Sequence, residues 1–206
     1  MTAPSQPPAV RHVSRRAILA ACFGGLAAAA CGAGPTLSPA TEVAKVSLPQ
    51  VAGAVRQAAD FPLAMYQGER EVGGATVSLR ELLGQGKPVV LNFWSGNCPP
   101  CRVEMPDFER AYRELRGRIL FVGVDVGPYV RLGSVDDGRR LVQELGITYP
   151  VGTTSEAAVV PAYRVLGMPT TAFITPAGRI VRQWTGILDY SALLRLVDEL
   201  MAASQP

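Results

Sequence analysis

Two cysteines separated by two prolines are the residues of this chain best suited to chemistry. They are Cys98 and Cys101, and they close the run SGNCPPC that begins at Ser95. Cysteines at this spacing can clamp a metal ion, form a structural bridge, or act as a redox couple that cycles between dithiol and disulfide. Each use requires different neighbours, so the rest of the sequence decides between them.

The chain lacks the neighbours that a metal site needs. Its single histidine is His12, and its two other cysteines, Cys22 and Cys31, also stand near the N-terminus. A zinc clamp normally needs two more nitrogen or sulfur ligands, so we expect no metal. The same shortage of histidine excludes Ser-His-Asp and Cys-His catalysis in the rest of the chain. A structural bridge over so short a loop stabilises little, which favours the redox couple.

The elements expected around the pair support this interpretation. Residues 88–94 form a continuous apolar run that predicts a strand buried on both faces, and a helical pattern follows from the cysteines to Leu115. Cys98 then lies at a helix N-terminus, where free N–H groups and the helix dipole stabilise a thiolate. Pro99 and Pro100 suit the first turn of a helix. We therefore predict Cys98 as the attacking nucleophile.

The remaining patterns predict an α/β fold. A short helical turn is expected at 79–83, a second buried strand at 118–125, helices at 134–146 and 157–166, and a hairpin of strands at 170–174 and 179–184. A last helix, capped by Asp189, has its apolar residues at helical spacing. This order predicts a central mixed sheet flanked by helices.

Composition and charge divide the chain into three parts. Of its 206 residues 48% are hydrophobic, which is enough for one core. The net charge of +3 comes from the arginines before residue 17, because the rest of the chain has 17 basic and 17 acidic residues. That balance gives no support for a nucleic-acid partner. We predict an export signal at 1–31, a flexible linker at 32–60 and a folded domain at 61–206.

The first part has the features of an export signal. Arg15 and Arg16 precede an apolar stretch at 17–30, which is shorter than the ~20 residues needed to cross a bilayer. The arginine pair resembles a twin-arginine signal, and residues 28–31 resemble the lipobox of bacterial lipoproteins. Lipidation of Cys31, an uncleaved anchor and ordinary cleavage all remain open. We expect a protein on the extracytoplasmic face of a bacterial membrane, lipid-anchored through Cys31.

Residues 61–203 resemble the TlpA/ResA/CcmG-like thiol–disulfide oxidoreductases of the thioredoxin superfamily. The resemblance is carried by residues 91–101, by Glu104 and Pro106, and by residues 167–173. It implies a thioredoxin-like fold with a strand and helix inserted before a cis Met168–Pro169 bond that faces the cysteines. The backbone of Met168 is then free to pair with an extended substrate. The residues expected to contact substrate are Trp94, Pro99, Pro100, Met168, Pro169 and Thr170.

The resemblance also assigns a role to Glu104. Thioredoxin has a buried aspartate where this chain has Asn92, and an amide cannot take the proton of Cys101. ResA-like proteins carry a glutamate at the position of Glu104, almost one helical turn after Cys101. A partly buried carboxyl there would have a raised pKa and could relay that proton. The alternative is an exposed helix glutamate.

The resemblance implies an enzyme that exchanges the Cys98–Cys101 dithiol and disulfide with protein substrates and needs no cofactor. We favour a reductase, for example in cytochrome c maturation, recharged by a membrane electron donor and acting as a monomer. An oxidase or isomerase of exported proteins remains open. So does a non-catalytic module that holds copper or a partner protein, for which Met105 and Met168 are the candidate further ligands.

Overall fold

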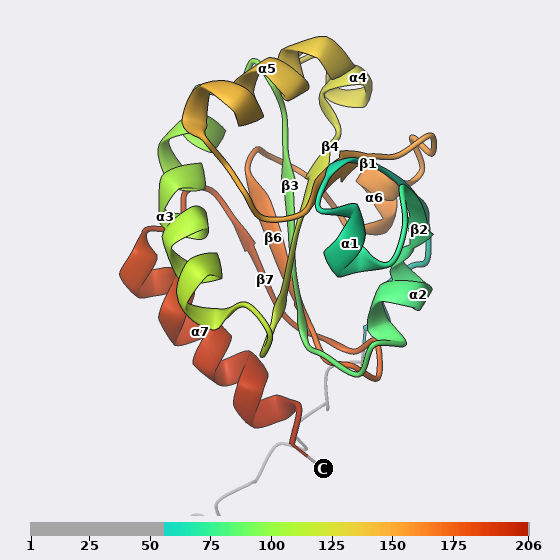
Figure 1. Cartoon of the computed structure of the whole chain (residues 1–206), viewed down its shortest axis with the longest axis vertical. Coiled ribbons are helices and arrows are strands. Elements are labelled where there is room, and N and C mark those ends of the chain that lie inside the picture. The colour runs from blue at the N-terminus through green and yellow to red at the C-terminus, as the bar shows by residue number, and fades with distance from the viewer. Residues whose placement is uncertain (1–55, 206) are drawn as a thin grey trace, which may run out of the picture. The chain divides into compact units, whose positions relative to one another are not determined.

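The computed structural model describes residues 56–205, which fold around one mixed sheet (Figure 1). In chain order the elements are β1 (Pro62–Gln67), α1 (Glu69–Val72), β2 (Thr76–Ser78), α2 (Leu79–Leu83), β3 (Val89–Trp94), α3 (Pro99–Leu115), β4 (Leu120–Asp125), α4 (Gly127–Val130), α5 (Val135–Leu145), β5 (Val151–Thr153), α6 (Val159–Ala162), β6 (Thr170–Ile174), β7 (Ile180–Thr185) and α7 (Tyr190–Ala203). The strands lie in the order β2-β1-β5-β4-β3-β6-β7.

The centre of the sheet is parallel and its two sides are antiparallel. β3 pairs in parallel with β4, and β4 pairs in parallel with β5. β6 runs antiparallel to β3 on one side, followed by β7, while β1 and β2 complete the other side in antiparallel pairs. The predicted fold class, a mixed sheet flanked by helices, is confirmed.

Both faces of the central strands are buried, as the apolar run at 88–94 predicted. Val90 and Trp94 of β3 belong to the core under α3, α5 and α7. Leu91 and Phe93 point to the opposite face and pack with residues of α2 and α6. Figure 1 shows the two groups of helices on opposite sides of the sheet. Successive side chains of a strand alternate between the faces, so each central strand contributes to both cores.

One predicted helix is shorter than expected. The pattern at 157–166 predicted a helix of that length, whereas α6 covers Val159–Ala162 alone. Arg164 adopts a left-handed conformation with φ 47°, and the N–H of Val165 turns back to the carbonyl of Val160 at 2.9 Å. A left-handed residue followed by an N–H that bonds back to a carbonyl of the helix is a common way for a helix to end. Residues 165–168 therefore form a loop that leads to β6.

The predicted signal at 1–31, with Cys31, lies outside the described residues, as does most of the predicted linker at 32–60. The described chain begins against β7, where Ile180 donates its N–H to the carbonyl of Arg56 at 2.8 Å. The hydroxyl of Tyr163 donates to the carbonyl of Ala59 at 2.7 Å. Residues 56–59 therefore already contact the domain. Within residues 56–205, no helix is long and apolar enough to cross a membrane.

Candidate active site

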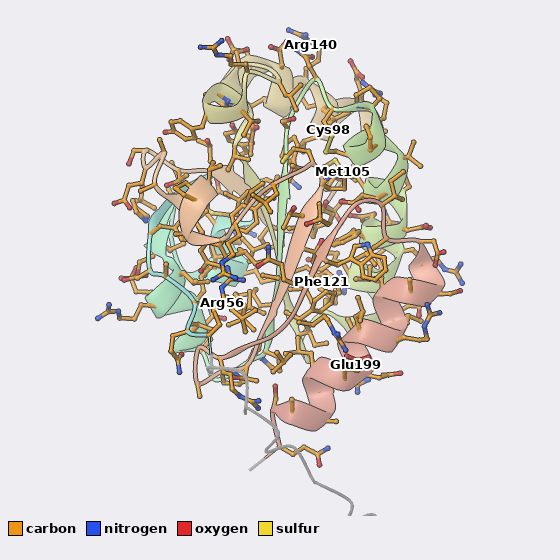
Figure 2. All side chains as sticks on the ribbon, turned by 180° about the vertical axis from the view of Figure 1, so that it is seen from behind. Arg56, Cys98, Met105, Phe121, Arg140 and Glu199 are labelled. Atoms are coloured by element: carbon orange, nitrogen blue, oxygen red, sulfur yellow. A yellow bond between two sulfur atoms is a disulfide. The ribbon has the colours of Figure 1, made fainter. Side chains whose placement is uncertain are left out.

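The two cysteines lie where β3 ends and α3 begins, at one end of the sheet (Figure 2). Cys98 and Cys101 are joined by a disulfide. Cys98 is the N-cap residue of α3, and its Sγ accepts the N–H of Cys101 at 3.2 Å. Cys98 is 4% exposed and Cys101 is fully buried. The sulfur that a partner can reach is therefore that of Cys98, which also faces the positive end of the helix dipole.

The loop before β6 lies beside the cysteine motif. The Met168–Pro169 peptide bond is cis, as the resemblance implied. Thr170, the next residue, pairs with Phe93 of β3, so the loop is fixed against the strand that leads to Cys98. The N–H of Gly186 donates to the carbonyl of Pro169 at 2.8 Å. Within the described residues, the backbone groups of Met168 make no hydrogen bond, which leaves them free for an extended peptide.

An apolar groove of about 420 Å³ opens next to Cys98. One side is formed by Pro99 and Pro100, a second by α4 and the turn after it, and a third by the loop before Pro169. All of its lining residues are uncharged: Cys98, Pro99, Pro100, Val130, Leu132, Val165, Leu166, Gly167 and Met168. Leu166, on its rim, is 91% exposed. The groove therefore suits an uncharged, apolar segment of a partner.

Trp94 and Thr170 occupy different positions from those expected of substrate contacts. Trp94 is fully buried beneath α3, because its place on β3 points it to the core that contains Cys98 and Cys101. Thr170 is also buried, and its hydroxyl donates to the carbonyl of Gly167 at 2.7 Å. Neither side chain lines the groove, so both belong to the packing beneath the site.

Glu104 is fully buried within α3 rather than exposed on it. Its Oε1 accepts the amide of Asn92 at 2.8 Å, and its Oε2 accepts the N–H of Leu188 at 3.1 Å. Burial raises the pKa of Glu104 to about 7, although the Leu188 N–H and the Asn92 amide act to lower it. A carboxyl with this pKa can both take and give a proton near neutral pH.

Asn92 has a role that the sequence did not assign. Its amide Nδ2 also donates to the hydroxyl of Thr171 at 3.0 Å, so it is held between that side chain and Glu104. The signal for this role was present, because Asn92 is a polar residue inside a continuous apolar strand. Asn92, which stands where thioredoxin has an aspartate, therefore donates a hydrogen bond that orients the carboxyl of Glu104.

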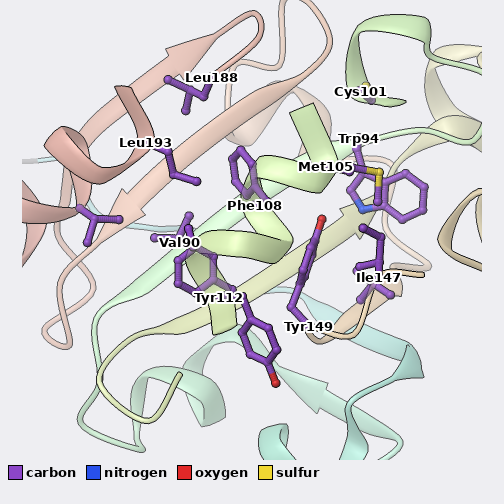
Figure 3. Packing of buried hydrophobic residues seen from close by; sticks show 14 of the residues in the cluster. Val90, Trp94, Cys101, Met105, Phe108, Tyr112, Ile147, Tyr149, Leu188 and Leu193 are labelled. Atoms are coloured by element: carbon purple, nitrogen blue, oxygen red, sulfur yellow. The ribbon is translucent and has the colours of Figure 1, made fainter. Parts of the chain in front are cut away.

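Tyr149 is a further polar residue buried in the core that contains Cys101. Its hydroxyl points toward Met105 and Trp94 (Figure 3), and among residues 56–205 it has no hydrogen-bond partner. Burial, followed by the negative charges of Glu104 and Glu109, raises the pKa of Tyr149 well above its ordinary value. The hydroxyl therefore stays neutral.

Both candidate copper ligands contact the core that contains Cys101. Met105 is fully buried in that core, whereas Met168 packs against it and also lines the groove. Among the residues that the structure describes, no cluster of three or more His, Cys, Asp and Glu side chains could hold a metal ion.

Comparison with known proteins gives consistent results. Residues 55–183 match the model of the AhpC/TSA family. A thiol-disulfide oxidoreductase ResA of Halalkalibacterium halodurans is 33% identical over 156 residues, which cover 76% of this chain and 80% of that protein. Among solved structures, a putative thiol:disulfide interchange protein DsbE from Chlorobium tepidum matches in fold, with a TM-score of 0.57 and 21% identity over 73% of this chain and 96% of that one. The exposed lipoprotein thioredoxin Etrx1 of Streptococcus pneumoniae has a TM-score of 0.53 and 27% identity over 68% of this chain and 99% of that one.

Proposed function

The chain belongs to the AhpC/TSA family and, within the thioredoxin superfamily, to the ResA-like thiol–disulfide oxidoreductases, and from this we propose that it reduces disulfides of exported proteins. The observation that carries the proposal is the Cys98–Cys101 disulfide, which stands at the mouth of an uncharged groove. Glu104 lies buried almost one helical turn further along α3. In this proposal Cys98 is the sulfur that attacks, Cys101 is the second sulfur behind it, and Glu104 accepts the proton of Cys101.

The proposed reaction begins with the reduced pair. The Cys98 thiolate attacks one sulfur of the substrate disulfide, forms a mixed disulfide and releases the other substrate sulfur as a thiolate. Cys101 then gives its proton to the Glu104 carboxylate and attacks the Sγ of Cys98. The second substrate sulfur leaves, and the Cys98–Cys101 disulfide forms. Two electrons have passed to the substrate, and a membrane electron donor returns them to the pair.

Substrate binding in this proposal uses the groove and the loop before Pro169. An extended segment pairs with the free backbone groups of Met168, as in strand addition. Pro99 and Pro100 contact the residues that flank the substrate disulfide. Because the groove is uncharged, the flanking residues that fit it are apolar.

We also propose that the protein is exported and held at the extracytoplasmic face of the membrane. The arginines and apolar stretch of the first 31 residues support export, and the sequence before Cys31 supports lipidation. A structural relative with 27% identity is itself described as an exposed lipoprotein. In this arrangement residues 32–60 form a spacer, and its end lies against the domain.

Single-cysteine variants test the order of attack. Cys101→Ala should accumulate a mixed disulfide with a protein substrate, because the resolving thiol is gone, whereas Cys98→Ala should not. Equal accumulation in both variants would contradict the assignment.

The reduction potential of the cysteine pair tests the direction of electron flow. A value close to that of thioredoxin, about −270 mV, supports a reductase, and one close to DsbA, about −120 mV, supports the oxidase alternative.

A further inference from the structure

A second carboxyl group is buried near the cysteine motif, and the thiol chemistry above does not use it. Asp125 is the last residue of β4 and pairs with Trp94 across the parallel ladder. It is fully buried. Its Oδ2 accepts the hydroxyl of Tyr66 at 2.9 Å, and its Oδ1 accepts the N–H of Gly127 at 2.9 Å. Burial of a carboxyl group costs free energy even when it is hydrogen-bonded, so its presence requires an explanation.

Helix α5 closes the space above Asp125. A β-carbon on Gly138 would lie 2.0 Å from Asp125 Oδ2 and 3.5 Å from the ring of Trp94. Glycine at this position therefore lets the helix backbone approach the carboxyl and exclude solvent from it. The carboxyl is enclosed by β1, β4, α4 and α5.

A series of hydrogen bonds connects Asp125 to the residue before Cys98. The N–H of Gly127 is bound by the carboxyl, and the carbonyl of Gly127 accepts the N–H of Leu132 at 3.1 Å. The carbonyl of Leu132 in turn accepts the N–H of Asn97 at 2.8 Å. Leu132 and Val130 also form one wall of the groove. The carboxyl thus fixes both a wall of the groove and the loop that carries Cys98.

Burial makes Asp125 easier to protonate than a carboxyl in water, yet the group is still mainly ionised at neutral pH. Burial raises the pKa of Asp125 to about 6, with the Gly127 N–H and the Tyr66 hydroxyl lowering it and the charge of Asp137 on α5 raising it. Tyr66 remains a donor, because burial and then the charge of Asp125 raise its pKa. The guanidinium of Arg139 lies 4.3 Å from the centre of the Tyr66 ring. The carboxylate accepts from two donors. Protonation at Oδ2 would turn that oxygen into a donor to the Tyr66 hydroxyl and remove the negative charge, so the charge-assisted bond from the Gly127 N–H would weaken.

We propose that Asp125 is a positioning residue for the thiol chemistry: its carboxylate holds α4 and the loop before Cys98, and protonation weakens that hold and lowers the reactivity of Cys98. This inference rests on the proposed function, since Cys98 is the group whose reactivity it controls. The group that senses pH lies at the end of β4, whereas the cysteines lie at the start of α3.

The test is the pH dependence of Cys98 alkylation by iodoacetamide in the reduced full-length chain, from pH 5 to pH 8, with each rate divided by the thiolate fraction. We expect the corrected rate in the wild type to fall about fivefold below pH 6, the effect of weakening the charge-assisted bond between Asp125 and the Gly127 N–H. Asp125→Asn should remove this step. Tyr66→Phe should move it to higher pH, because the hydroxyl that lowers the pKa of Asp125 is gone. Asp198→Asn, at an exposed position of α7, is the control and should leave the step unchanged.

The outcomes separate the two proposals. A step that is the same in the wild type, Asp125→Asn and Tyr66→Phe would overturn the role of Asp125, while the reactivity of Cys98 would still support the proposed function. Faster alkylation of Cys101 than of Cys98 in the wild type would instead contradict the proposed function. If Asp125→Asn fails to fold, Tyr66→Phe decides alone, since it retains the carboxyl and removes a single donor.

Discussion

Replacing Glu104 by glutamine should change how the stability of the oxidised protein depends on pH. Burial raises the pKa of Glu104 from 4.5 to about 7, so the folded protein binds this proton more tightly than the unfolded chain does. A carboxyl with a raised pKa favours the folded state at low pH, and this contribution is lost as the pH rises from 4.5 to about 7. Glutamine has no proton to release, so the variant lacks this loss.

The size of the effect follows from the two pKa values. Each tenfold change in proton affinity corresponds to about 1.4 kcal/mol. A pKa raised from 4.5 to about 7 therefore changes the free energy of unfolding by about 3 kcal/mol across this range. Relative to the wild type, Glu104→Gln should gain about 3 kcal/mol of stability between pH 4 and pH 8.

A second difference in unfolding free energy between Glu104→Gln and the wild type, equal at every pH, adds to this pH-dependent change. The carboxylate accepts from Asn92 at one oxygen and from Leu188 at the other, whereas an amide has one acceptor oxygen. The second bond survives if Asn92 turns its Oδ1, which has no partner among the described residues, toward the new amide nitrogen. If it does not turn, one bond worth about 1 kcal/mol is lost at every pH. The slope with pH, rather than the value at one pH, is therefore diagnostic.

The measurement is urea unfolding of the oxidised wild type, Glu104→Gln and a control, Glu156→Gln, at intervals from pH 4 to pH 8. Glu156 is an exposed glutamate, so its variant should follow the wild type throughout. The free-energy difference between Glu104→Gln and the wild type should increase steadily with pH. Parallel curves for these two proteins would refute the reasoning, because they would mean that Glu104 titrates alike in the folded and unfolded states.

Two other variants test the groove and the packing above Asp125. Leu166→Glu, at a position that is 91% exposed, should fold normally but slow the reduction of a protein disulfide about tenfold while leaving the reaction with a small aromatic disulfide unchanged; equal slowing of both reactions would argue against a docking role. Gly138→Ala, whose methyl would lie 2.0 Å from Asp125 Oδ2, should lose at least about 2 kcal/mol of unfolding free energy. Gly74→Ala, where the nearest atom is 3.4 Å away, is the control, and a similar loss in both would contradict this explanation.

The elements next to the cysteines could be predicted because their signals are local. The apolar run of β3, the hairpin around Gly178 and the helix capped by Asp189 are all confirmed. Helix α5 likewise begins after Ser134, whose side chain accepts the N–H of Asp137, and ends at Gly146 in a left-handed conformation. Each of these depends on residues within a few positions of each other, which is the range that periodicity and capping rules describe.

The strand β1 was not predicted because its structure depends on distant residues. Of its six residues only Leu63 and Met65 are buried, too few to establish an alternating pattern. Its place between β2 and β5 is set by pairs such as Met65 with Gly152, far along the chain. Burial against such partners can override local propensity, which is why strand assignments depend on context.

The positions of the site residues were predictable to the extent that the helix and the loop fix them. Cys98 at the helix start follows from the local pattern, and the cis bond before Pro169 was implied by the family resemblance; both are found. Which way Trp94 and Thr170 point was not predictable in this manner, because it depends on strand register. A shift of one residue along β3 would have placed Trp94 on the other face.

The polar residues buried near Trp94 show where pattern and function disagree. Asn92 interrupts the apolar run of β3, and Asp125 ends the apolar run of β4, at positions where a packed sheet favours aliphatic side chains. Asn92 binds Glu104, and Asp125 binds the N–H that starts α4. Asn92 therefore connects the central sheet to α3, which carries both the cysteine pair and Glu104. Asp125 connects the sheet to α4, which forms a wall of the groove. A polar residue inside a buried run is thus the signal to look for, because its desolvation cost persists only where its hydrogen bonds hold something in place.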